Sequence, residues 1–116
     1  MKKYELTGKT KHYFGITLYQ IKALKSFGDV KEGDLGGWIE KEINLSQDGN
    51  CWVYGNARVY GNAQVSDDAW FYGNAQVSGN AWVYGNARVS DDAWVYGNAW
   101  VYGNARVYGN ARRSPE

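Results

Sequence analysis

The stretch from Gly97 to Tyr102 reads Gly-Asn-Ala-Trp-Val-Tyr, one copy of a six-residue phrase that fills the second half of this 116-residue chain. The phrase, Gly-Asn-Ala-x-Val-Tyr/Ser, recurs from Gly49 to Ala111 without an insertion or deletion. Successive copies open at Gly49, Gly55, Gly61, Asp67, Gly73, Gly79, Gly85, Asp91, Gly97, Gly103 and Gly109. A strict short period indicates one small unit stacked many times, which is typical of a β-helix.

Each copy predicts one short strand followed by one bend. In the copy that ends at Tyr102, Val101 is β-branched and suits a strand interior, and Ala99 lies two residues earlier and points the same way. Trp100 and Tyr102 alternate with these residues and are expected to point outward. Glycine and asparagine tolerate backbone conformations that most residues resist, so the Gly-Asn step supplies the corner.

The spacing of a valine and an alanine four residues later, as in Val53 to Ala57, resembles the hexapeptide repeat of left-handed β-helices. In that family three hexapeptides make one triangular turn, so the resemblance implies that residues eighteen apart stack. The fold class expected here is all-β, a left-handed parallel β-helix with a small β-hairpin and loop cap at its N-terminus. Three interior columns follow from the arithmetic: Val53, Phe71, Val89 and Val107; Val59, Val77 and Val95; and Val65, Val83 and Val101.

The same spacing sorts the outward side chains into three faces. The first face carries Trp52, Trp70, Arg88 and Arg106 beside Tyr54, Tyr72, Ser90 and Tyr108. The second carries Arg58, Gln76, Trp94 and Arg112 beside Tyr60, Ser78 and Tyr96. The third carries Gln64, Trp82 and Trp100 beside Ser66, Tyr84 and Tyr102.

The chain divides into a cap with a lead-in coil (1–48), the repeat (49–113) and a short tail (114–116). In the cap, the alternation in Tyr19–Ala23 predicts a half-buried strand that pairs with Lys2–Leu6 through a turn at Gly15. The glycine-rich stretch Gly33–Trp38 is expected to be a shaped loop. Leu45 falls in phase with the repeat and is expected to begin the first, imperfect coil.

The amino-acid composition restricts the kinds of partner that the protein can bind. Thirteen Lys and Arg residues balance twelve Asp and Glu residues, which argues against general DNA binding. No apolar run is long enough for a membrane span or a signal peptide, so a cytoplasmic location is expected. The single cysteine, Cys51, occupies an alanine position of the repeat and is expected to be a buried thiol. Six Trp and ten Tyr residues exceed what so small an interior can hold, and exposed aromatic residues indicate a partner.

Few residues of this sequence could act in catalysis. Hexapeptide-repeat acyltransferases use a histidine base near the coils, and the related carbonic anhydrases need three histidines, whereas His12 is the only histidine here and lies outside the repeat. The acidic pairs at Asp67 and Asp91 are twenty-four residues apart, so they fall on different corners and cannot share an ion. We therefore expect no catalytic residue, no metal site and no cofactor.

The phrase Gly28–Glu40, followed by tyrosine-rich hexapeptides, resembles small uncharacterised proteins encoded by phages and prophages. The preferred hypothesis is a non-catalytic protein of this kind in the bacterial host cytoplasm. It would form a homo-oligomer, with a trimer favoured, and bind a nucleotide-like small molecule or a host protein, for example as a counter-defence protein. Two alternatives stay open: a structural or glycan-binding rod of a virion or surface assembly, and a degenerate acyltransferase.

Two residue sets are predicted to carry these interactions. Rings can stack on a ligand and guanidinium groups can pair with its phosphate, which favours a ligand site at Trp70, Tyr72, Arg88 and Arg106. The uncharged aromatic rows of the third face favour an oligomer contact at Trp82, Tyr84, Trp100 and Tyr102.

Overall fold

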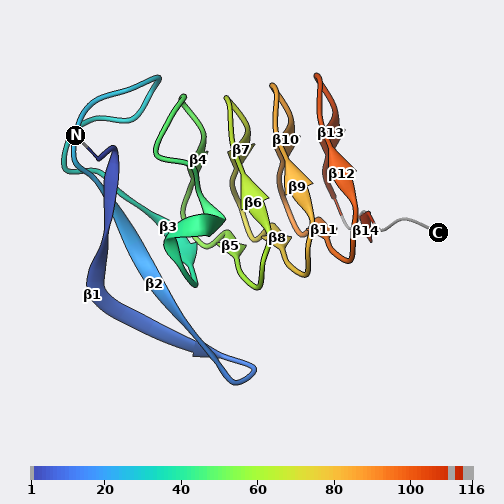
Figure 1. Cartoon of the computed structure of the whole chain (residues 1–116), viewed down its shortest axis with the longest axis horizontal. Helices are drawn as coiled ribbons and strands as arrows, with labels where there is room; N and C mark the ends of the chain where they lie inside the picture. The colour runs from blue at the N-terminus through green and yellow to red at the C-terminus, as the bar shows by residue number, and fades with distance from the viewer. Residues whose placement is uncertain (1, 110–111, 114–116) are drawn as a thin grey trace.

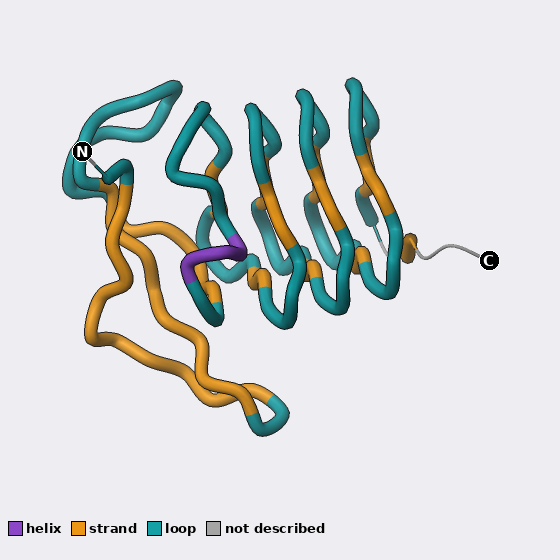
Figure 2. Tube along the Cα trace, viewed as in Figure 1, coloured by secondary structure: helices purple, strands orange, loops and turns teal. Residues whose placement is uncertain are grey.

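The computed structural model describes residues 2–109 and 112–113, and it is a parallel β-solenoid closed at its N-terminal end by a β-hairpin (Figure 1). The tail at 114–116 lies outside the described residues. The coils stack in a row from the hairpin end to the C-terminal end of the chain, with short strands separated by bends (Figure 2). The all-β, β-helical fold expected from the repeat is confirmed.

Three long elements precede the coils: β1 (Tyr4–Tyr13), β2 (Ile16–Ala23) and β3 (Leu35–Ile39), followed by a 3₁₀ turn, η1 (Glu42–Asn44). Two-residue strands then follow at six-residue intervals: β4 (Trp52–Val53), β5 (Arg58–Val59), β6 (Gln64–Val65), β7 (Trp70–Phe71), β8 (Gln76–Val77), β9 (Trp82–Val83), β10 (Arg88–Val89), β11 (Trp94–Val95), β12 (Trp100–Val101), β13 (Arg106–Val107) and β14 (Arg112–Arg113).

The strands pair in parallel with partners eighteen residues away and so form three faces. We call the four-stranded sheet β4-β7-β10-β13 the arginine face and the three-stranded sheet β6-β9-β12 the tryptophan face. The third sheet, β1-β2-β3-β5-β8-β11-β14, contains the hairpin and is the arm face. The three faces correspond to those predicted from the eighteen-residue spacing.

The interior is filled by the predicted columns. All ten column residues are buried, with exposed fractions from 0% to 4%. Between them, the alanines of the repeat and Cys51 pack in the same core cluster. The corners need left-handed backbone, as predicted: Asp67 and Asp91 replace glycine there with φ of 58° and 59°. Each of the two carboxylates accepts a 3.0 Å hydrogen bond from the backbone N–H of a glycine in the next coil, so both are corner residues.

The hairpin pairs as predicted near its base, where Tyr4 lies opposite Ala23 and Leu6 opposite Ile21. Toward its tip it lies against the side chains of β5 and β8. Tyr13 donates a 3.0 Å hydrogen bond to Gln76, and its ring receives the guanidinium of Arg58 at 4.3 Å. The hairpin therefore covers part of one face of the solenoid.

Most of the glycine-rich stretch predicted as a loop is instead strand β3, which is buried from Gly36 onward, so the expectation was wrong there, whereas Gly33 and Asp34 precede the strand. β3 pairs in parallel with β5, so it acts as an additional rung below the first complete coil. A side chain at Gly36 would place a Cβ atom 2.7 Å from both Ile21 and Trp52, and one at Gly37 would lie 2.7 Å from Val53. The glycines are there because the neighbouring elements approach closely, which local sequence alone does not reveal. Leu45 bridges to Val65 and is buried, as expected of the first coil.

Candidate functional site

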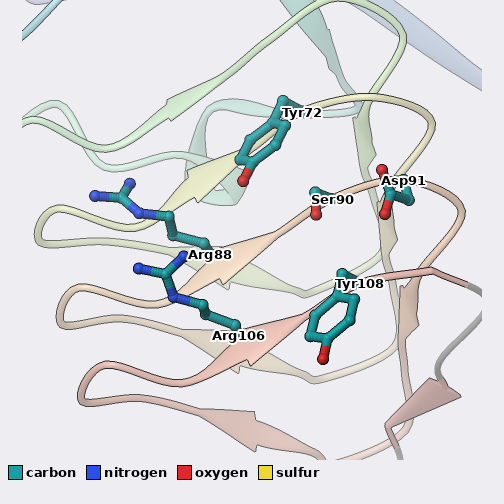
Figure 3. A pocket seen from close by; sticks show the side chains of 6 residues that line it. All are labelled: Tyr72, Arg88, Ser90, Asp91, Arg106 and Tyr108. Atoms are coloured by element: carbon teal, nitrogen blue, oxygen red, sulfur yellow. The ribbon is translucent and has the colours of Figure 1, made fainter.

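The candidate site lies on the arginine face, where strands in successive coils place Arg88 directly beside Arg106. Adjacent parallel strands are about 4.8 Å apart, so the two guanidinium groups form a cationic pair. Both side chains extend in the same direction, away from the row that holds Tyr72 and Tyr108 (Figure 3). Within the described part of the chain, neither arginine has an ion-pair partner.

Arg88 is held in place by aromatic packing. Its guanidinium carbon lies 4.4 Å from the centre of the Trp70 ring, and Trp70 contacts Tyr54 with ring centres 5.7 Å apart. The Nη1 atom of Arg88 is buried and has no hydrogen-bond partner among the described residues. The Nε atom of Arg58 on the arm face is in the same state, and for Arg88 the ring of Trp70 is the contact that holds the guanidinium.

The row of Tyr72, Ser90 and Tyr108, beside the arginines, forms a slot. Tyr72 and Tyr108 are exposed by 38% and 65%, and Ser90, the residue between them in the row, is 8% exposed. Because Ser90 is small, two tyrosine rings two rungs apart flank an open position with a serine at its base (Figure 3). Asp91 follows at the corner, where one carboxylate oxygen accepts the Gly109 N–H at 3.0 Å.

These residues line two adjoining hollows. One, of about 510 Å³, is lined by Tyr72, Arg88, Ser90, Asp91, Arg106 and Tyr108 (Figure 3). The other, of about 500 Å³, is lined by Asp29, Tyr54, Trp70, Tyr72, Arg88 and Arg106. We call them the slot hollow and the Asp29 hollow. Both volumes are within the range of small-molecule sites.

The four residues predicted for a ligand site therefore come together around the Asp29 hollow. Their roles differ from those expected, because Trp70 packs between Tyr54 and Arg88 and orients the arginine instead of offering a free platform. Ser90 and Tyr108 were in the predicted rows, but the slot they make was not predicted. Asp29 belongs to the cap, and no periodicity could place it on this face.

Trp52, the first residue of the arginine row, is only 1% exposed because the cap covers it. The rings of Tyr4 and Phe27 contact it with centres 6.2 and 5.3 Å away. The open part of the arginine face therefore begins at the next coil, around Trp70.

The tryptophan face carries the predicted oligomer residues. Trp82 stacks on Trp100 with ring centres 6.2 Å apart, and Tyr84 stacks on Tyr102 at 5.5 Å. Trp100 and Tyr102 are 60% and 57% exposed. The molecule thus has an aromatic surface here, and its role in self-association stays a prediction.

Two groups that could do covalent chemistry lie elsewhere. Cys51 is fully buried as predicted, and burial raises the pKa of its thiol, so the thiol stays protonated at neutral pH. Lys3 is also buried and donates to the Cys51 carbonyl at 2.8 Å; burial lowers the pKa of this lysine. His12 lies on β1, with its Nδ1 atom 3.3 Å from Thr17 Oγ1.

Among the residues that the structure describes, no group of three or more His, Cys, Asp or Glu side chains could hold a metal ion. Over the same residues, no helix is both long and apolar enough to cross a bilayer.

The fold defines the class of protein: a parallel β-solenoid built from hexapeptide repeats, with two adjoining hollows on one face. In agreement, the family model for the YdcK β-solenoid repeat matches residues 53–67, 75–91, 81–97 and 99–114. The chain is also similar to the uncharacterized acetyltransferase YdcK of Escherichia coli strain K12. The two are 39% identical over an alignment that covers 47% of this chain and 19% of that relative. The match thus spans about a fifth of the length of the relative.

This comparison corrects one prediction. The expectation of a protein without catalysis is contradicted, because the similar protein carries the name of an acetyltransferase. Counting histidines tests only for chemistry that needs an imidazole. The count says nothing about residues that bind and orient the substrates of a transfer reaction.

Proposed function

We propose that the arginine face binds a nucleotide, with its phosphate on Arg88 and Arg106 and its base in the slot between Tyr72 and Tyr108. The observation that carries the proposal is the cationic pair beside an open slot. Guanidinium groups bind phosphate through paired N–H donors, and an anion between two arginines also relieves their mutual repulsion.

The slot has dimensions that suit a planar ring. Tyr72 and Tyr108 are two rungs apart, which is roughly 9.6 Å at the usual strand spacing. A ring inserted midway would lie roughly 4.8 Å from each tyrosine, within the 4.5–7 Å separation of stacked aromatic rings. The backbones of the two rows are two residues apart along each strand, about 6.8 Å, and the arginine side chains extend farther from the slot, so a ligand that reaches both must be extended.

The acetyltransferase name of the similar protein suggests which nucleotide to test first. Acetyl coenzyme A, an acetyl donor, consists of an adenine nucleotide joined to a thioester arm. We therefore propose acetyl coenzyme A as the leading candidate ligand and acetyl transfer as the activity of the protein. Nucleotide signals belong to the same chemical class, and a phage counter-defence role would act through such a ligand.

The arginine pair can be tested by calorimetric titration with AMP. Arg88→Ala and Arg106→Ala should each weaken AMP binding by about tenfold or more, because each removes charge-assisted hydrogen bonds worth about 1.5–3 kcal/mol. The loss should shrink as salt rises. Lys22→Ala removes the same charge from an exposed position on β2 and should leave the affinity unchanged. AMP affinity that is equal in all three variants, or absent in the wild type, would contradict the proposal.

A second proposal concerns self-association through the tryptophan face, favoured by its two stacked ring pairs, in which Trp100 and Tyr102 are more than half exposed. We expect light scattering to give a homo-oligomer, most simply a trimer, at micromolar concentration. Trp100→Ser should shift the mass toward the monomer because it removes the most exposed indole. Tyr108→Ser, an equally exposed ring on the arginine face, is the control and should leave the mass unchanged. A wild-type monomer at high concentration would exclude this contact.

A further inference from the structure

The two hollows of the arginine face are parts of one trough. They share Tyr72, Arg88 and Arg106; one continues to Ser90, Asp91 and Tyr108, and the other to Asp29, Tyr54 and Trp70. From Tyr54 at one end to Tyr108 at the other, the trough spans three rungs, about 14 Å. A mononucleotide bound as proposed above occupies the slot hollow and the arginine pair, and it leaves the Asp29 hollow empty.

The Asp29 hollow differs in chemistry from the slot. Of its three aromatic residues, Tyr72 also borders the slot, and Tyr54 and Trp70 already pack against each other with their rings tilted by 59°, so these two present no pair of parallel faces for a second base. The hollow instead offers the carboxylate of Asp29 and the hydroxyl of Tyr54. Burial, followed by the nearby Asp29 charge, raises the pKa of Tyr54, so its hydroxyl keeps its proton.

Asp29 is held at this position by the fold of the cap. It lies in a tight turn closed by two backbone hydrogen bonds between Phe27 and Val30, of 2.9 and 2.8 Å. Phe27 packs edge-on against Trp52, and Val30 is buried, which fixes the turn at the end of the arginine face. The Asp29 carboxylate makes no hydrogen bond to the described residues, so its oxygens are available as acceptors.

We infer that the trough also accepts a nucleoside diphosphate whose second phosphate carries a hydroxyl-rich group such as a sugar, a second ligand class beside acetyl coenzyme A. This inference rests on the proposed nucleotide site. The base lies between Tyr72 and Tyr108, the diphosphate spans Arg88 and Arg106, and hydroxyls of the terminal group donate to Asp29. Because both hollows adjoin the arginine pair, a ligand whose two parts are joined by a diphosphate can place one part in each hollow.

The test compares ADP with ADP-ribose, which share a base and a diphosphate and differ in the terminal sugar. ADP-ribose should bind about tenfold more tightly than ADP, the gain expected from hydroxyls donating to a carboxylate. Asp29→Ala should abolish this preference. It should not weaken ADP binding, since removing a negative charge near the phosphates lowers repulsion.

Glu32→Ala is the matched control, because Glu32 is an exposed acid of the same connection that lines neither hollow, and the preference should survive. Circular dichroism of each variant checks its fold. If ADP binds through the arginines but ADP-ribose binds no better, or if Asp29→Ala keeps the preference, the two-part ligand is wrong and the nucleotide site stands. If ADP does not bind at all, both proposals fail.

Discussion

Val83→Asp should leave the β-helix unfolded at room temperature. Val83 is fully buried in the middle of an interior column, between Val65 and Val101 in the adjacent coils. An unpaired carboxylate there costs several kcal/mol, a large part of the 5–15 kcal/mol that stabilises a typical domain. Thermal unfolding followed by circular dichroism should show no cooperative transition, and Val95→Asp should behave alike on the arm face.

The neighbouring residue supplies the control. Trp82 precedes Val83 on the same strand but points outward and is 45% exposed. Trp82→Asp loses the stacking on Trp100, worth about 1 kcal/mol, without burying a charge. It should therefore lower the melting temperature by only a few degrees. Equal effects of the two aspartates would show that the inward and outward assignments are wrong.

The solenoid was predictable from sequence because its repeat has no insertion. A constant eighteen-residue spacing fixes which residues stack, so counting alone places Phe71 between Val53 and Val89, where it lies. The alternation of the strand then fixes which side chains face inward. Both rules depend only on local backbone geometry and counting.

The cap was less predictable, because its conformation depends on contacts between segments. Gly36 and Gly37 read as loop residues in sequence, whereas in the structure they allow β3 to lie against β2 and the first coil. Phe14 is another example. It turns the hairpin with a positive φ of 46° and is 90% exposed, in a position where asparagine or glycine is usual.

The candidate site was predictable to the same extent as the coils. The spacing placed Arg88 beside Arg106 and put Trp70 and Tyr72 in the preceding rung. It did not show that Arg88 packs on Trp70, because side-chain conformation is not a property of the repeat. It also missed Asp29, whose position depends on how the cap folds over Trp52. The repeat spacing was therefore enough to identify the arginine pair, whereas Asp29 could be placed beside it only from the tertiary structure.

Asn44→Leu should destabilise the protein by about 3–4 kcal/mol, since Asn44 makes four hydrogen bonds of about 1 kcal/mol each. Asn44 is fully buried where the cap meets the first coil. Its side-chain oxygen accepts the backbone N–H groups of Glu40 and Lys41 at 3.0 and 2.9 Å. Its amide nitrogen donates to the carbonyls of Gly61 and Ala63 at 3.2 and 2.9 Å.

The reason for this role lies in the geometry of the coils. One coil further on, the equivalent carbonyls of Gly79 and Ala81 accept backbone N–H groups, each at 2.9 Å. Around η1 the rung is irregular, and the Asn44 side chain supplies the donors instead. Urea denaturation should show the loss for Asn44→Leu, and also for the isosteric Asn44→Asp, whose carboxylate cannot donate. Asn80→Ala removes an exposed corner amide with one 3.4 Å bond and should cost less than about 1 kcal/mol. A loss at Asn44 no larger than the loss at Asn80 would mean that the apolar contacts of the cap and its backbone pairing with β5 hold it to the solenoid without Asn44.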